Sequence, residues 1–185
     1  HWNSTCTVDL TVVSYWYAKP GAKDGFRPLT PADLKLDVLP PYIPKKVKGA
    51  IEGEEFRIIT RTGLVEPQDI GGCSNDRHMY WREGKVGDKL VLGFTSQQAG
   101  TFEVHARFVK AVDYGIVQVS INGKKVCAPI DLYNDGVIVS DQKDLGTFDL
   151  KQGENEISLE IVGANPKAIK KYMASLDYLI LESVK

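Results

Sequence analysis

The chain has 185 residues, of which 43% are hydrophobic and 25% are charged, and this composition is typical of one globular domain with a core and an additional segment. Its formal net charge is only −1, whereas nucleic acids and anionic membranes are bound by concentrated positive fields. No run of about 18 apolar residues is present to cross a bilayer. We therefore expect neither nucleic acid nor a membrane among its partners.

Residues 1–48 differ in pattern from the rest of the chain. Residues 7–18 predict one long strand, whose alternation slips at Val12-Val13 as it does in a β-bulge. The following residues, 19–49, contain six of the nine prolines and predict an extended, semi-rigid linker. Because the sequence has neither a starting methionine nor a signal peptide, we interpret residues 1–48 as the last strand and linker of a preceding domain.

Alternation of apolar and polar residues dominates the second half of the chain. In residues 101–109, for example, Glu103 and His105 fall on the polar face of a half-buried antiparallel strand. The strands predicted in this way are residues 56–60, 88–94, 101–109, 116–121, 124–130, 146–150, 155–162 and 176–182.

Turn signals separate these strands. Asn122-Gly123 is a strong hairpin signal, and Gly153 ends a second turn. Residues 165–173 predict one helical turn, with Pro166 suited to its first position. We therefore expect an all-β fold over residues 49–185, a β-sandwich (jelly roll) of about eight antiparallel strands that the extra N-terminal strand and proline-rich linker precede.

Known catalytic motifs are missing from the sequence. The histidines form no zinc-binding spacing, and no nucleophile elbow, P-loop or Rossmann glycine pattern occurs. Glycoside hydrolysis needs two carboxylates across one bond, and no pair is set apart here. The three cysteines are far apart in sequence and fit buried thiols better than one bridge and one free thiol. We expect no catalytic residues in this chain.

Several blocks resemble known carbohydrate-associated families. Over residues 51–182, "GTFEVHARF", "VQVSINGKKV", "NEISLEIVGAN" and "LDYLILE" resemble the β-sandwich carbohydrate-binding modules of families 6 and 35. A further set, "KAVDYGIVQVSINGK", "PIDLYNDGVIVSDQKDLGTFDL" and "IVGANPKAIKKYMASLDYLILE", resembles the C-terminal module of secreted bacterial proteins of domain-of-unknown-function family 2961, which is similar to glycoside hydrolase family 172.

The second resemblance extends to the N-terminal segment. "VVSYWYAKPGAKDGFRPLTPADL" resembles the last strand and exit segment of that family's catalytic β-sandwich. It implies that residues 1–48 are left from a catalytic-type domain, that the parent protein is secreted, periplasmic or on the surface of a bacterial cell, and that any glycosidase activity belongs to the parent.

The family 6 and 35 resemblance also implies a structural calcium ion. In those modules a Glu-x-Glu on the first strand and an Asp on the last strand hold Ca²⁺, and Glu52, Glu54 and Asp177 match that arrangement. Adjacent carboxylates repel unless a hard cation neutralises them. The alternative is that Glu52 and Glu54 share a solvated face with a nearby Lys or Arg.

Aromatic and amide side chains gather in the predicted loops. Loops that concentrate rings and amides are typical sugar sites, so a carbohydrate ligand would contact Tyr80, Trp81, Tyr114, Asn165 and Tyr172. The alternative is that the large rings cover the ends of the core.

Two functions follow from these observations. The first is a non-catalytic accessory module of a carbohydrate-active protein that binds sugar. The second is a structural module that packs on the parent hydrolase-like domain or on other copies of the chain. An exposed aromatic shelf would favour the first, and a broad apolar patch the second.

Overall fold

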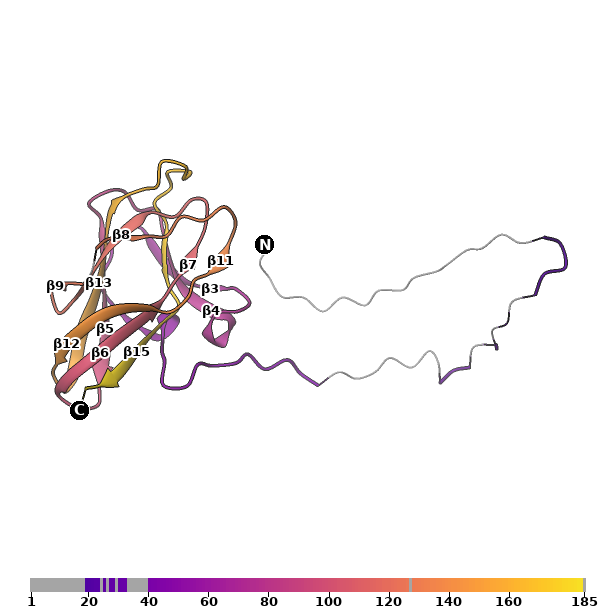
Figure 1. Ribbon diagram of the computed structural model, residues 1–185, viewed down its shortest axis with the longest axis horizontal. Coiled ribbons are helices and arrows are strands. Elements are labelled where there is room, and N and C mark those ends of the chain that lie inside the picture. Colours follow the sequence, from indigo (N-terminus) through magenta and orange to yellow (C-terminus); the bar gives the residue numbers. More distant parts are fainter. Residues whose placement is uncertain are drawn as a thin grey trace. The chain divides into compact units, whose positions relative to one another are not determined.

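The computed structural model describes residues 19–23, 25, 27, 28, 30–32, 40–126 and 128–184 (Figure 1). The chain divides into two units. Described residues up to 43 form one of them and contain no strand or helix, whereas residues 44–184 contain every described strand. The strand expected at residues 7–18 lies outside the described residues. No described helix has the length and apolar character that crossing a membrane would need.

One layer of the sandwich is a four-stranded antiparallel sheet in the order β1-β15-β6-β12. Its strands are β1 (Ile51–Glu52), β6 (Gly100–Arg107), β12 (Lys143–Leu150) and β15 (Tyr178–Ser183). Ile51 lies opposite Leu179, and Glu52 lies opposite Tyr178, which places the start of the module beside the closing strand. Figure 1 shows β12, β6 and β15 side by side.

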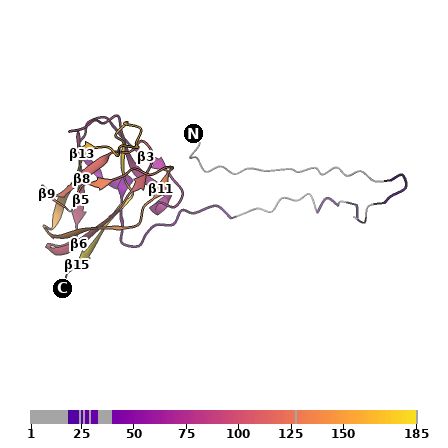
Figure 2. The ribbon, with the colours of Figure 1, turned by 45° about the horizontal axis from the view of Figure 1, so that its top comes forward.

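The other layer is a larger antiparallel sheet with the order β10-β8-β13-β5-β2, to which β9 is added through β8. Its strands are β2 (Arg57–Thr60), β5 (Lys89–Ser96), β8 (Ile116–Ile121), β9 (Lys124–Lys125), β10 (Ile130–Asp131) and β13 (Gly153–Gly163). Both ribbon views show β13, β8 and β5 together in this layer (Figure 2).

Two smaller sheets complete the module. A three-stranded sheet in the order β14-β4-β3 contains β3 (Leu64–Asp69), β4 (Arg77–Arg82) and β14 (Ala174–Leu176). A two-stranded sheet pairs β7 (Val109–Lys110) with β11 (Ile138–Val139). Two short 3₁₀ helices, η1 (Gly53–Glu55) and η2 (Ser74–Asp76), follow β1 and precede β4.

The core lies between the two main sheets and is built by the alternation visible in the sequence. The inward side chains of β6 and β13 are buried, as the period-two pattern predicts. The largest fully buried side chains come from all parts of the module: Trp81, Phe108, Leu90, Leu92, Ile121, Leu132, Leu145, Ile157, Leu159, Ile161, Leu176 and Leu179. The fold is thus the all-β sandwich that the sequence predicts.

Five local predictions need correction. Residues 101–109 divide into β6 and β7 at Phe108, and residues 176–182 divide between β14 and β15 at Asp177. Residues 124–130 form two short strands, β9 and β10, and not one strand. Residues 165–173 contain a turn closed by the Ala168 N–H donating to the Asn165 carbonyl, with no helical turn. Residues 77–82, which were expected in a loop, form the central strand of the three-stranded sheet.

Candidate functional site

The three acidic residues of the predicted calcium site converge at one end of the first sheet. Glu52 ends β1, Glu54 lies in η1, and Asp177 links β14 to β15. Glu52 is 2% exposed and Asp177 is 0% exposed. The Gly53 N–H donates to the Asp177 carbonyl at 2.6 Å, which draws the two segments together.

Ser74 in η2 joins two of these carboxylates. Its hydroxyl donates to Glu52 Oε1 at 2.9 Å, and its backbone N–H donates to Asp177 Oδ1 at 3.0 Å. The neighbouring Asn75 side chain donates to Glu54 Oε1 at 3.0 Å. Arg107 donates through Nε to the other Asp177 oxygen. Sequence reasoning missed Ser74 and Arg107, because no spacing connects them with partners that are 22 to 103 positions away in the chain.

Two carboxylate oxygens of the cluster have no hydrogen-bond partner among the described residues. They are Glu52 Oε2 and Glu54 Oε2, and both are buried. Burial raises the pKa of Glu52, an effect that the Ser74 hydrogen bond opposes and the Glu54 charge reinforces. Burial likewise raises the pKa of Asp177 against the opposing effect of Arg107. Such unpaired oxygens are costly unless a cation or a proton compensates them.

The aromatic residues expected to bind sugar are brought together, but two of them are core residues. Trp81 lies in β4 with 0% exposure, and its indole Nε1–H donates to the Thr62 carbonyl at 2.6 Å. Tyr114 is 4% exposed. Neither ring offers a face to a ligand, so the prediction of a Trp81 and Tyr114 binding surface is wrong. The tendency of large rings to close the end of a β-sandwich accounts for both positions.

The other three expected ligand residues are half-buried. Tyr80 stacks on Tyr114 with ring centroids 6.2 Å apart, and its hydroxyl contacts the Met173 sulfur at 2.7 Å. Tyr172 has a positive φ of 54° and precedes Met173, which forms an isolated β-bridge with Tyr114. Asn165 lies elsewhere in the loop and donates to Asp131 Oδ2 at 2.6 Å. Between residues 44 and 184, every described aromatic side chain is buried or half-buried.

A groove of about 400 Å³ lies beside Asp131. Phe108, Pro129 and Ile130 supply its apolar part. Polar side chains line the remainder: Lys110, Asp131, Ser140, Asp141, Gln142 and Lys143. Within the described part of the chain, the side chains of Lys110, Asp141 and Lys143 make no hydrogen bond or ion pair, so their capacity to bind a ligand is unused.

A second groove, of about 460 Å³, is lined by residues of β2, β12 and β13 together with two turn residues: Arg57, Ile59, Asn122, Asp149, Lys151, Glu154 and Glu156. Several of its polar side chains are already hydrogen-bonded or ion-paired. Arg57 pairs with Glu154 at 2.6 Å, and Asn122 donates to Asn155 at 2.9 Å. We therefore regard the groove beside Asp131 as the better ligand site.

Two solved structures with TM-scores above 0.5, a xanthan lyase and a glucanotransferase, show the fold. A Paenibacillus xanthan lyase matches with a TM-score of 0.67 and 24% identity over 76% of this chain and 14% of that chain. A Paenibacillus sp. cycloisomaltooligosaccharide glucanotransferase, solved with cycloisomaltoheptaose, matches with a TM-score of 0.51 and 14% identity over 75% of this chain and 19% of that one. A family 35 carbohydrate-binding module from Clostridium thermocellum matches with a TM-score of 0.49 and 19% identity over 74% of this chain and 100% of that module.

These similarities are to small parts of large enzymes or to a single module. The chain spans only 14% of the xanthan lyase and 19% of the glucanotransferase. At such identities, the shared property is the β-sandwich. No protein-family model matches the sequence, and the search of curated proteins gives no match.

Proposed function

We propose that this chain is a non-catalytic accessory module that binds carbohydrate in the groove beside Asp131. The observation that carries the proposal is a groove whose lining combines apolar Phe108, Pro129 and Ile130 with the unpaired side chains of Lys110, Asp141 and Lys143. Carbohydrates need both features, because their C–H faces pack on apolar surface while their hydroxyls exchange hydrogen bonds. The names of the similar structures, a xanthan lyase and a glucanotransferase solved with a cyclic oligosaccharide, support a sugar ligand.

Recognition in this groove depends on hydrogen bonds more than on stacking. Phe108, the aromatic residue in the lining, is 1% exposed and cannot present a ring face. Lysines supply donors and Asp141 supplies acceptors, whereas Asn165 holds Asp131 in place from outside the groove. The ligand class that fits best is therefore an oligosaccharide with several free hydroxyls.

The proposed parent is a secreted bacterial carbohydrate-active protein. The motif resemblance to the C-terminal module of domain-of-unknown-function family 2961, similar to glycoside hydrolase family 172, supports this origin. Residues 1–48 are then the end of a catalytic-type domain, and residues 49–185 are the accessory module.

Calcium is the proposed structural cofactor of the module. The unpaired buried oxygens of Glu52 and Glu54 fit a hard cation that takes oxygen ligands. Asp177 adds the third carboxylate, although both its oxygens already contact Ser74 and Arg107, so direct ligation requires one of these contacts to be exchanged. The ion would supply charge neutralisation at the junction of β1 and β15.

Binding to an array of plant, bacterial and fungal glycans tests the proposed function. A hit is then measured by isothermal titration with the wild-type chain, with Lys143→Ala and with Asp141→Ala. Both side chains are exposed, so the variants should keep their melting temperature while affinity falls at least tenfold. Lys151→Ala in the second groove is the matched control. Unchanged affinity in both groove variants contradicts this placement of the site.

A second candidate function rests on strand β2. It forms an edge of the larger sheet, and all four of its residues are exposed, including Ile58 and Ile59 at 40% and 37%. An apolar edge strand is a ready pairing surface, which favours a structural module that docks on another copy or on the parent domain. A concentration-dependent dimer that Ile59→Lys abolishes, together with no glycan binding, would support this candidate.

A further inference from the structure

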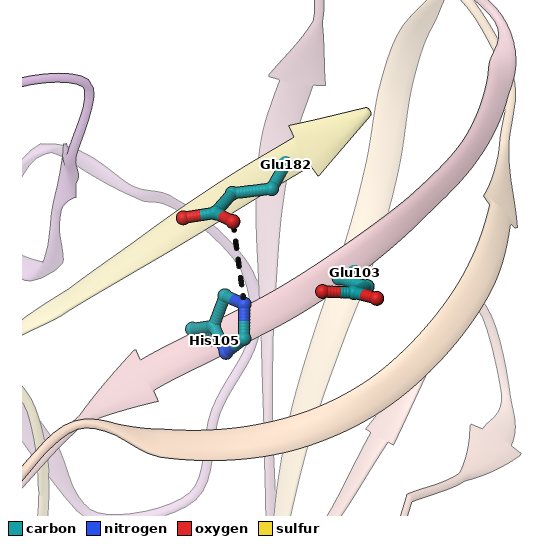
Figure 3. A group of neighbouring side chains, drawn as sticks. All are labelled: Glu103, His105 and Glu182. Atoms are coloured by element: carbon teal, nitrogen blue, oxygen red, sulfur yellow. Dashed lines mark ion pairs between the residues drawn. The ribbon is translucent and has the colours of Figure 1, made fainter. Parts of the chain in front are cut away.

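An imidazole and two carboxylates that belong to neither site above meet on the outer face of the first sheet. Glu103 and His105 are two residues apart on β6 and so share one face of the strand. Glu182 of β15 lies directly opposite Glu103. The ligand atoms of these three side chains all lie within 4.8 Å of one another, and Figure 3 shows them turned toward a common point.

The ring of His105 is surrounded by acceptors but bonded to none of the described residues. Its Nε2 is 4.0 Å from Glu182 Oε2, and its Nδ1 is 3.9 Å from Asp144 Oδ1. Both separations exceed hydrogen-bond length. The His105 side chain is nevertheless only 15% exposed, so two nitrogens with hydrogen-bonding capacity are held in a largely covered position.

Basic side chains nearby are engaged elsewhere. Arg107, the next outward residue of β6, is paired with the buried Asp177 and lies 4.7 Å over the Tyr178 ring. Asp149 on β12 adds further negative charge to this face and binds Thr101 at 2.6 Å. Among the described residues, no Lys or Arg pairs with the carboxylates around His105.

We propose that Glu103, His105 and Glu182 form a binding site for a divalent transition metal, with zinc as the ion of best fit. One imidazole nitrogen with two carboxylate oxygens is a donor set that suits zinc, whereas calcium takes oxygen ligands. The ligands stand on paired strands, so the scaffold positions them without a loop rearrangement. Three protein ligands leave at least one coordination position open to solvent.

The site joins the closing strand to its neighbour in the sheet. Glu182 lies near the end of β15, whereas Glu103 and His105 are central in β6. A bound ion would link these strands by bonds that do not depend on the buried core. Zinc should therefore raise the melting temperature of the native chain, since a ligand that binds the folded state alone stabilises it.

Isothermal titration with zinc chloride tests the site in the full chain. The buffer contains excess calcium to fill any oxygen-ligand site, and the thiols are alkylated beforehand so that they do not compete. His105→Gln and Glu182→Gln should each weaken zinc binding at least tenfold. Asp149 lies on the same face of the sheet but outside the group of ligands, and Asp149→Asn removes one negative charge, as Glu182→Gln does. The zinc affinity of Asp149→Asn should therefore stay within twofold of wild type. Circular dichroism checks that the variants remain folded.

Cobalt gives an independent readout. Co²⁺ bound to the native chain should shift the histidine ring resonances of His105 while leaving those of the buried His78 in place. The proposal is overturned if zinc fails to bind the native chain, if His105→Gln binds it as tightly as wild type, or if Asp149→Asn loses as much affinity as the two ligand variants. The last result would show general attraction to an acidic face.

Discussion

Neutralising Glu52 should have opposite effects with and without calcium. In excess EDTA, Glu52→Gln removes a buried charge whose Oε2 has no partner in the described structure, so the variant should melt at a higher temperature than wild type. In calcium it removes a ligand, so the variant should lose the stabilisation that the ion supplies. Simple loss of a surface charge would give neither effect.

The size of the calcium effect follows from linkage. Extracellular calcium modules bind with a Kd on the order of 0.1 mM, so 10 mM calcium is about a hundredfold excess and stabilises the native state by about 2.7 kcal/mol. At roughly 4 °C per kcal/mol for a domain of this size, calcium should raise the wild-type melting temperature by about 10 °C. The same addition of calcium should raise the melting temperature of the Glu52→Gln variant by less than a third of that amount.

The pH dependence provides a second test of the same cluster. Burial raises the pKa of Glu52 and of Asp177, so without calcium their contribution to stability is complete at acid pH and is lost as pH rises through these raised values. Calcium should reverse that slope, because the ionised forms then bind the ion. Differential scanning calorimetry measures both slopes, with exposed Glu55→Gln as control. Two results together would refute the reasoning. The melting temperature of the metal-free wild-type chain would not rise when calcium is added, and it would equal that of the metal-free Glu52→Gln variant.

Three further predictions concern the core. Trp81→Ala should lower the free energy of unfolding by about 3–5 kcal/mol in urea titrations, since it empties a fully buried site; a loss below 1 kcal/mol would show that the ring is dispensable to the core. Burial lowers the pKa of His78 to about 4, so its contribution of about 3 kcal/mol to the free energy of unfolding should be present above pH 6.5 and disappear as pH falls toward 4. A His78→Gln variant should lack this pH dependence. Equal pH slopes of the free energy of unfolding in the variant and the wild type would contradict the prediction. Gly53→Ala should fail to fold or melt far below wild type, because its Cβ would overlap the Leu176 carbonyl oxygen; near-normal melting would show that this junction is loose.

Much of the fold is readable from local pattern. Alternation predicts β6 and β13 because nearly all of their inward residues are apolar; the exception is Asn155 of β13, which is 1% exposed. The Asn122-Gly123 turn is predictable because both residues adopt positive φ, 47° and 79°, which asparagine and glycine tolerate. The approach of Glu52 to the closing strand was expected from family resemblance, and the register with Tyr178 agrees with it.

Other features depend on long-range contacts that no pattern shows. β3 contains Pro67 and charged residues, and the side chains of β4 follow no period-two alternation of polar and apolar residues. Tertiary packing and not propensity therefore forms this pair. The buried state of Trp81 follows from that packing. Part of the group around His105 is predictable from the sequence, because Glu103 and His105 fall on one face of a predicted strand. The third member, Glu182, is not predictable, because its position opposite Glu103 depends on the register of β15 against β6.

The most direct test of carbohydrate binding is the glycan array followed by titration of its strongest hit against wild type and Lys143→Ala in parallel. The account predicts a saturable oligosaccharide ligand for the wild-type chain and at least a tenfold weaker affinity for the variant, with equal melting temperatures. A glycan array that shows no binding, or a glycan that the wild type and Lys143→Ala bind with equal affinity, would contradict the account.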